Sequence, residues 1–169
     1  MADIDTASLY DRDFYLWARD QAEAMRLLRD SASGLGNLAA SLQRVDWNNL
    51  IEELNDLAGR DRRELRGRIE TIVEHLVKLE LSTARDPRFG WMDTVQRSRD
   101  EVVQLFEDSP SLRREIATLA AAPGIDRRAK TAVDDLVRRG EIPGGMTPPT
   151  YTVAQILEDW WPEPKGTNP

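Results

Sequence analysis

The sequence predicts an all-α fold, a helical bundle of about five to six helices. Apolar residues recur at intervals of three and four along most of the chain, and no long stretch alternates strictly between apolar and polar residues. The 169 residues are 40% hydrophobic and 31% charged, which is typical of a globular protein. We therefore expect one helical domain over residues 9–162, with a flexible N-terminus over 1–8 and a flexible tail over 163–169.

The first predicted helix follows a polar start of the chain. Either Asp11 or Asp13 can cap it, because a short carboxylate side chain accepts hydrogen bonds from the free N–H groups of a first helical turn. The helix is expected to end before Ser33 after about 20 residues, and a short helix is expected over 37–42. The expected apolar stripe of the first helix is Phe14, Trp17, Ala18, Ala24, Met25 and Leu28.

Two interpretations of the next segment are possible. Asp46 can cap a helix that begins at Trp47, and apolar residues keep one helical phase from there to about Leu81. In the alternative, Gly59 ends one helix and Asp61 caps another, which gives a hairpin. A turn would preserve the phase only by coincidence, so we favour one long central helix over 47–81.

The rest of the chain also predicts helices. One opens at Trp91, and the Ser109-Pro110 pair is a helix start, because proline is favoured at the first helical position behind a capping serine. Pro123-Gly124 interrupts the pattern, and a further amphipathic helix is closed by Gly140. Thr152 is expected to cap a last short helix after an extended connector over 142–150.

Five short motifs in this order resemble one bacterial family. They are Tyr10-x-x-Asp13-Phe14-x-x-Trp17, Trp47-x-x-Leu50-x-Glu52-Glu53, His75-Leu76-Val77-Lys78, Asp108-Ser109-Pro110-Ser111-Leu112 and Tyr151-Thr152-x-x-Gln155-Ile156-Leu157. Together they are similar to the family known as domain of unknown function 29, over residues 9–162. The resemblance implies an all-helical fold and carries no catalytic residues over to this chain. Two departures from the family pattern are a longer connector over 31–44 and the break at Pro123-Gly124.

Composition excludes several kinds of site. The chain has no cysteine and one histidine, His75, which rules out disulfides, thiolate zinc and paired-histidine zinc motifs. In helical spacing His75 has Ile72 and Leu79 as its neighbours, so no Glu-x-x-His pair forms. We expect neither a metal nor a cofactor.

Charge and hydropathy set the expected location and partners. The formal net charge is −7, from 23 basic and 30 acidic residues, which gives no general attraction to nucleic acid or anionic lipid. No run of 18 apolar residues occurs, and the start at Met1 has neither a basic nor an apolar leader region. We expect a cytoplasmic protein that binds no membrane. The preference for arginine over lysine indicates a bacterial source.

The candidate functional residues fall into three groups. His75 and Lys78 are candidates for catalysis, because a histidine near neutrality can act as a general base. Trp160 and Trp161 are partner-binding candidates, because adjacent helical positions point about 100° apart and both rings cannot be buried in one direction. The third group is the arginine cluster, candidates for binding a partner, a phosphate ligand or a nucleic acid: Arg60, Arg62, Arg63 and Arg66.

We expect a non-catalytic interaction or regulatory protein that binds a protein partner or another copy of itself. No phosphate loop, dinucleotide fingerprint or serine-nucleophile motif occurs, whereas amphipathic helical surface is abundant. Two alternatives stay open. One is nucleic-acid or phosphate binding through the arginines between Arg60 and Arg68, and the other is an enzyme that uses carboxylates with His75 and Lys78.

Overall fold

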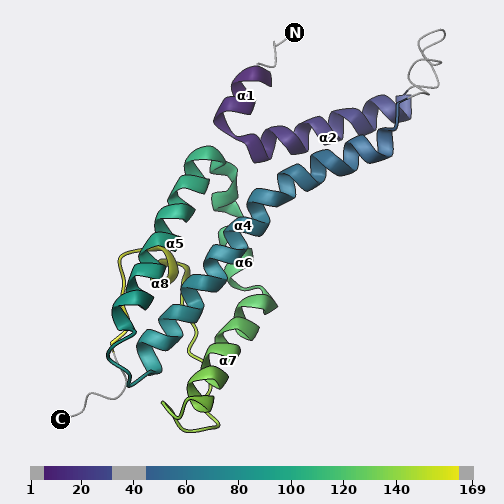
Figure 1. The fold of residues 1–169 in the computed structure, drawn as a ribbon. Helices are drawn as coiled ribbons and strands as arrows, with labels where there is room; N and C mark the ends of the chain where they lie inside the picture. Colours follow the sequence, from purple (N-terminus) through teal and green to yellow (C-terminus); the bar gives the residue numbers. More distant parts are fainter. Residues whose placement is uncertain (1–5, 32–44, 164–169) are drawn as a thin grey trace. The chain divides into compact units, whose positions relative to one another are not determined.

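The computed structural model describes residues 6–31 and 45–163, and the regular structure in these ranges is helical, with no strand. This confirms the all-α class (Figure 1). The helices are α1 (Thr6–Arg12), α2 (Phe14–Ser31), α4 (Trp47–Leu81), α5 (Arg88–Asp108), the 3₁₀ helix η2 (Pro110–Arg114), α6 (Ile116–Ala120), α7 (Pro123–Arg138) and α8 (Val153–Leu157).

Contacts between residues group the chain into two compact units. Unit 1 comprises Met1–Arg63 with Leu105–Arg113, and unit 2 comprises Glu64–Gln104 with Arg114–Pro169. A single domain over residues 9–162 stays a prediction. The helix expected over 37–42, the long connector and most of the flexible tail lie outside the described residues.

Asp13 begins α2 in unit 1. Its Oδ1 accepts the N–H of Leu16 at 2.9 Å, so of the two predicted caps Asp13 is the one that is used. Asp11 instead lies inside α1, a helix that has no counterpart among the predicted elements. Residues 6–8, expected in the flexible N-terminus, belong to α1 as well.

Unit 1 is built on an antiparallel pair, α2 and the first part of α4 (Figure 1). The guanidinium Nη1 of Arg29, near the end of α2, donates to the Oδ1 of Asn48 in the first turn of α4 at 3.2 Å. The expected stripe of α2 is wrong as a core face, because the stripe residues apart from Ala18 stay partly or fully exposed. The buried residues of the pair are Tyr15, Ala18, Ala22, Ile51 and Ala58.

The segment 47–81 forms one helix, which confirms the favoured interpretation and makes the hairpin at Gly59 wrong. Asp46 caps it as expected, since its Oδ1 accepts the N–H of Asn49 at 3.3 Å. Among the described glycines only Gly140 and Gly145 have a positive φ, so Gly59 adopts no turn conformation. The unbroken apolar phase prevails over the local cost of the glycine. In unit 2 this helix buries Leu65, Ile69, Ile72, Leu76 and Leu79.

The remaining helices begin and end close to the predicted signals. Helix α5 begins at Arg88, three residues before the expected start at Trp91. Its buried apolar residues are Trp91, Val95, Val102, Leu105 and Phe106. Ser109-Pro110 opens the 3₁₀ helix η2 rather than an α-helix. The predicted break at Pro123-Gly124 is the start of α7, with Pro123 at the first helical position.

Two caps close unit 2. After α7, Gly140 has a φ of +71°, and the N–H of Glu141 donates to the carbonyl of Leu136 at 3.0 Å, which together form a Schellman motif. Thr152 caps α8 in a reciprocal capping box with Gln155, as expected. No helix in the described ranges combines the length and the apolar character that crossing a membrane requires.

Candidate functional sites

His75 lies on α4 in unit 2, partly buried, with Lys78 one turn further on. The ring Nδ1 of His75 is 2.9 Å from the carbonyl oxygen of Thr71 and donates to it, since a carbonyl only accepts. Burial lowers the pKa of His75, and the bond to Thr71 opposes this shift. The imidazole is therefore held in its neutral form, with the proton on Nδ1.

Lys78 is engaged in an ion pair with Glu74. Its Nζ donates to the Oε1 of Glu74 at 2.5 Å, and the Nε of Arg128 lies 3.5 Å from the other carboxylate oxygen. Burial alone would raise the pKa of Glu74, but the hydrogen bond and charge of Lys78, together with His75 and Arg128, lower it. Within the described ranges, no three side chains capable of metal ligation come together.

The arginine cluster of α4 is largely paired with acidic side chains. Arg63 bonds to the carbonyl of Asp56 at 3.2 Å, Arg66 lies 3.9 Å from Glu70, and Arg62 also has an interaction partner. Arg60 is exposed beside Asp61 and Asp108 in a shallow pocket. These pairings engage guanidinium groups that would have to contact phosphates if the cluster bound nucleic acid.

Trp160 and Trp161 meet a buried arginine that the sequence analysis did not single out. Arg99 of α5 is 4% exposed and donates to the carbonyls of Gln155, Ile156 and Trp160 at 2.8–3.0 Å. Its guanidinium lies over the ring of Trp161, 4.8 Å from the ring centroid. Arg99 thus holds the chain after α8 in place, and both tryptophans stay half-buried.

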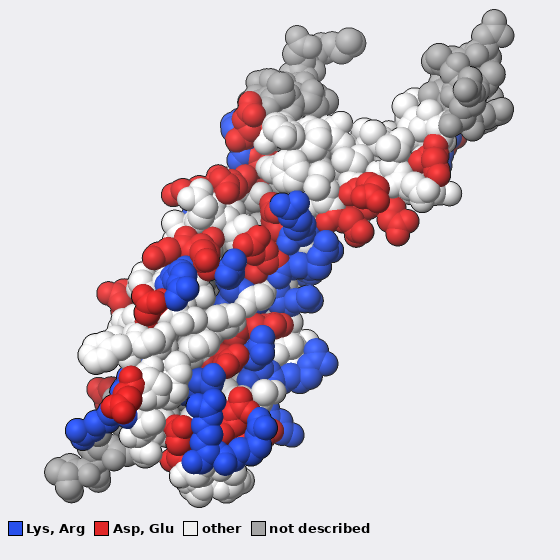
Figure 2. Space-filling model, viewed as in Figure 1, with Lys and Arg blue, Asp and Glu red and all other residues white. Residues whose placement is uncertain are grey.

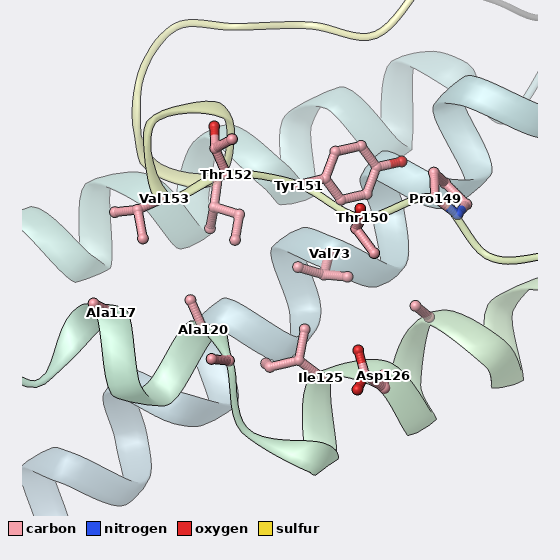
Figure 3. Close-up of a pocket in the computed structure, with 13 residues that line it drawn as sticks. Val73, Ala117, Ala120, Ile125, Asp126, Pro149, Thr150, Tyr151, Thr152 and Val153 are labelled. Carbon is pink, nitrogen blue, oxygen red and sulfur yellow. The ribbon is translucent and has the colours of Figure 1, made fainter.

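An apolar pocket of about 360 Å³ lies between α4, α6, α7 and the segment that leads into α8 (Figure 3). Figure 3 shows Ala117, Ala120 and Ile125 on one side and the segment from Tyr151 to Val153 on the other, with Val73 of α4 at the back. Small side chains on α6 create this space. Among the described residues that line it, Asp126 is the one that carries a charge.

A second pocket, of about 680 Å³, shares the segment Pro149–Tyr151 with the first. We call it the aromatic pocket. The hydroxyl of Tyr151 donates to the Oε2 of the buried Glu80 at 2.9 Å, and the rings of Tyr151 and Trp160 are 5.9 Å apart at 55°. Its lining is Glu80, Pro149, Thr150, Tyr151, Gln155, Trp160, Trp161, Pro162 and Glu163. His75 and Lys78 line neither pocket.

The helix pair of unit 1 has two unlike flanks. On one flank, Asn55 of α4 and charged residues of α2 line a polar pocket that includes Arg19 and Glu23. On the other, Phe14 of α2 and Leu57 of α4 line a pocket together. We call this second side the apolar flank; it consists of Phe14, Trp17, Met25, Leu28, Leu50, Leu54 and Leu57.

A comparison with protein families decides the relationship of this chain. The model of "Domain of unknown function DUF29" matches residues 9–161. The chain belongs to the DUF29 family. This confirms the resemblance carried by the five motifs. A crystal structure of an alpha-helical protein of unknown function from Rhodospirillum rubrum has a TM-score of 0.64 and 18% identity, covering 89% of each chain. That similarity shows the fold alone. No curated protein matches the chain.

The structure of this DUF29 protein brings two of its motifs together in unit 1. Tyr10, Phe14 and Trp17 pack against one another with ring centroids 4.8–5.7 Å apart. Asp13, from the same motif, bonds to Ser111 of the Asp108–Leu112 motif. These polar residues at helix starts therefore join segments distant in the sequence.

Sequence reasoning missed the aromatic pocket of the DUF29 protein. Tyr151 was part of a family motif, but Glu80 gave no signal, because it resembles an ordinary charged residue on an amphipathic helix. One cue was present. Arg99 comes four residues after Val95 and three before Val102, which places a charged residue on the apolar face of the helix.

Proposed function

We propose that this DUF29 protein is a non-catalytic interaction module that associates with a second copy of itself through the apolar flank of unit 1. The observation that carries the proposal is the mismatch between the apolar and the buried faces of the helix pair. Large apolar side chains lie beside the contact between the helices, whereas three of the five residues that fill that contact are alanines.

The mismatch follows from helical geometry. At about 100° per residue, the direction shared by Phe14, Trp17, Met25 and Leu28 is turned roughly 90° from that of the buried residues of α2. On α4, Leu50 and Leu57 are turned by a similar angle from Ile51 and Ala58. Leu28 and Leu50 are 42% and 43% exposed. Both stripes lie on the same side of the antiparallel pair, as the pocket shared by Phe14 and Leu57 indicates.

A second copy suits this flank for two reasons. An antiparallel helix pair with one apolar side completes a four-helix arrangement when it packs against its own copy about a two-fold axis. The charges of α4 are also segregated along the helix. Glu52, Glu53 and Asp56 come first, and Arg60 and Arg63 follow them, as the red and then blue surface along α4 shows (Figure 2).

The charge order is self-complementary. Of these charged residues, Glu53 and Arg60 are the two nearest the apolar flank in helical spacing, and in a two-fold pair whose α4 helices run in opposite directions Glu53 of one copy faces Arg60 of the other. Charge complementarity of this kind fixes the register of an interface, while the apolar residues supply most of its stability. A partner of different sequence would have to supply an apolar face and a complementary order of charges independently.

Sedimentation analysis of the full chain tests the proposal. We expect a dimer, and we expect Leu28→Glu and Leu57→Glu to be monomeric with unchanged helix content, because a carboxylate on the apolar flank would be desolvated without a partner. Leu27→Glu is the matched control, since Leu27 is 61% exposed and points away from that flank. Its dimer should persist.

A charge exchange tests the orientation. Glu53→Arg should weaken the dimer, and the double variant with Arg60→Glu should restore it, because the two changes exchange the facing charges. A wild-type chain that stays monomeric over the accessible concentration range would overturn self-association. So would a dimer that Leu27→Glu disrupts and Leu57→Glu leaves intact.

A further inference from the structure

The aromatic pocket of unit 2 combines aromatic faces with buried acid. Tyr151 and Trp160 form two of its walls, with their ring planes inclined at 55°, and Trp161 contributes a third ring to the lining. Glu80, also in the lining, is 8% exposed. Aromatic faces carry negative potential and attract cations, most strongly where the cation is already desolvated.

A hydrogen bond joins Tyr151 and Glu80 in the lining of this pocket. Burial raises the pKa of Tyr151 far above its usual value, and the hydrogen bond and charge of Glu80 raise it further. Tyr151 therefore stays a phenol, and its hydroxyl donates to the Oε2 of Glu80. A second carboxylate, that of Glu163, lies in the lining as an exposed residue.

Among the described residues that line this pocket there is no basic side chain. Arg99 is buried, lies over the ring of Trp161 and donates to backbone carbonyls. Its contacts fix the positions of Gln155 and Trp160, both of which line the pocket. The aromatic walls are thus set by internal bonds before any ligand arrives, which reduces the entropy lost on binding.

We propose that the aromatic pocket binds an organic cation with apolar substituents, held by the rings of Tyr151, Trp160 and Trp161 and by the carboxylate of Glu80. A quaternary ammonium group fits this chemistry, because it has no N–H to donate, it is weakly hydrated, and it combines a full charge with an apolar surface. The source of the cation is either a small molecule or a modified basic side chain of a protein. This site lies in unit 2 and does not depend on self-association through unit 1.

Choline and its uncharged isostere, 3,3-dimethylbutan-1-ol, form the decisive pair of probes. The two have the same shape and differ in charge. We expect choline to shift the indole N–H resonances of Trp160 and Trp161 in a saturable manner, in buffers matched for ionic strength with sodium chloride. The isostere should bind at least about tenfold more weakly, because cation–π attraction and the carboxylate act on charge.

Variants locate the site. Trp160→Ala and Glu80→Gln should each weaken choline binding about tenfold, and Trp160→Phe should retain part of the affinity because it keeps an aromatic face. Glu107→Gln, which removes an exposed carboxylate outside the pocket, is the control and should bind as the wild type does. Circular dichroism checks that every variant keeps its helix content.

A peptide carrying trimethyllysine distinguishes the two sources. Tighter binding of the peptide than of choline indicates a protein ligand, and tighter binding of choline indicates a small molecule; either result supports a cation site. Equal binding of choline and its isostere would overturn the proposal. The absence of any saturable response to both choline and the peptide would overturn it as well. A monomeric chain that binds choline would leave this inference intact while the dimer proposal fails.

Discussion

Asp13 and Ser111 are 98 residues apart in the sequence and are joined by two hydrogen bonds. The carboxylate of Asp13 accepts the backbone N–H of Ser111 at 2.7 Å and its hydroxyl at 2.9 Å. The same carboxylate accepts the N–H of Leu16 at the start of α2. One side chain thus satisfies free N–H groups at the starts of both α2 and η2, although charged groups are rarely as buried as Asp13, which is 7% exposed.

Replacing Asp13 should destabilise the protein strongly. Asp13→Ala removes a helix cap and leaves the N–H of Ser111 without its acceptor, so we expect a loss of about 2–4 kcal/mol in the free energy of unfolding. Urea denaturation followed by circular dichroism measures it. Asp11→Ala, in exposed α1, is the control and should change stability by no more than about 0.5 kcal/mol. Similar losses in both variants would contradict the bridging role of Asp13.

Proline at position 61 tests the continuity of α4. Asp61 lies inside the helix and accepts the hydroxyl of Ser109 at 3.0 Å, so Asp61→Ala measures the loss of that bond alone. Asp61→Pro should cost about 3 kcal/mol more than Asp61→Ala, because proline removes a helical hydrogen bond and clashes with the preceding turn. Chemical denaturation of the two variants gives the difference. If proline costs no more than alanine, the helix has a turn near Gly59.

The single histidine gives a pH dependence that can be assigned without ambiguity. Because burial lowers the pKa of His75 in the folded chain below its ordinary value of 6.5, the unfolded chain binds more protons just below that pH. The contribution of His75 to stability is therefore complete above about pH 6.5 and falls as the pH decreases below it. Proton NMR should give a His75 pKa below 6.5.

A variant checks the sign of this effect. His75→Asn should flatten the pH dependence of unfolding between about pH 5 and 6.5. The lowered pKa of Glu74 acts in a separate pH window, since the contribution of Glu74 to stability is lost as the pH falls below its ordinary pKa of 4.5. A His75 pKa above 6.5, or an unchanged slope in His75→Asn, would contradict the burial of a neutral ring.

Replacing Arg99 should destabilise the protein far more than replacing the nearby Arg97. Arg99→Met keeps the apolar stem but leaves three carbonyls around α8 without their donor, so we expect a loss of about 3 kcal/mol and faster amide exchange in α8. Arg97→Met should have little effect, because Arg97 is an exposed residue paired only with exposed Asp93. Equal stability of the two variants would mean that the chain after α8 is held by apolar packing alone.

Local sequence patterns were sufficient to predict most of the helices. The continuity of α4, the caps at Asp13, Asp46 and Thr152, and the closing glycine of α7 depend on short-range periodicity and on side chains within one helical turn. The same short range explains why α1 was missed, since a seven-residue helix gives too few positions to establish a stripe.

The hydrogen-bond partners of several polar side chains lie far away in the sequence. Ser109 was predicted as an ordinary cap, yet it is fully buried, accepts the N–H of Tyr15 and donates to Asp61. The aromatic pocket likewise needs Glu80 of α4 beside Tyr151, 71 residues away. No local pattern contains such pairs, because a hydrogen bond between distant segments depends on how the helices pack.

The sequence by itself determined that this protein is helical, where most of its helices begin and end, and to which family it belongs. Tertiary structure alone decided which face of α2 is buried. The apolar stripe was visible in the sequence, but α2 buries Tyr15, Ala18 and Ala22 instead, and the two alanines allow neighbouring helices to approach closely. Periodicity reports where apolar residues lie around a helix, whereas the neighbouring helix selects which of them it covers.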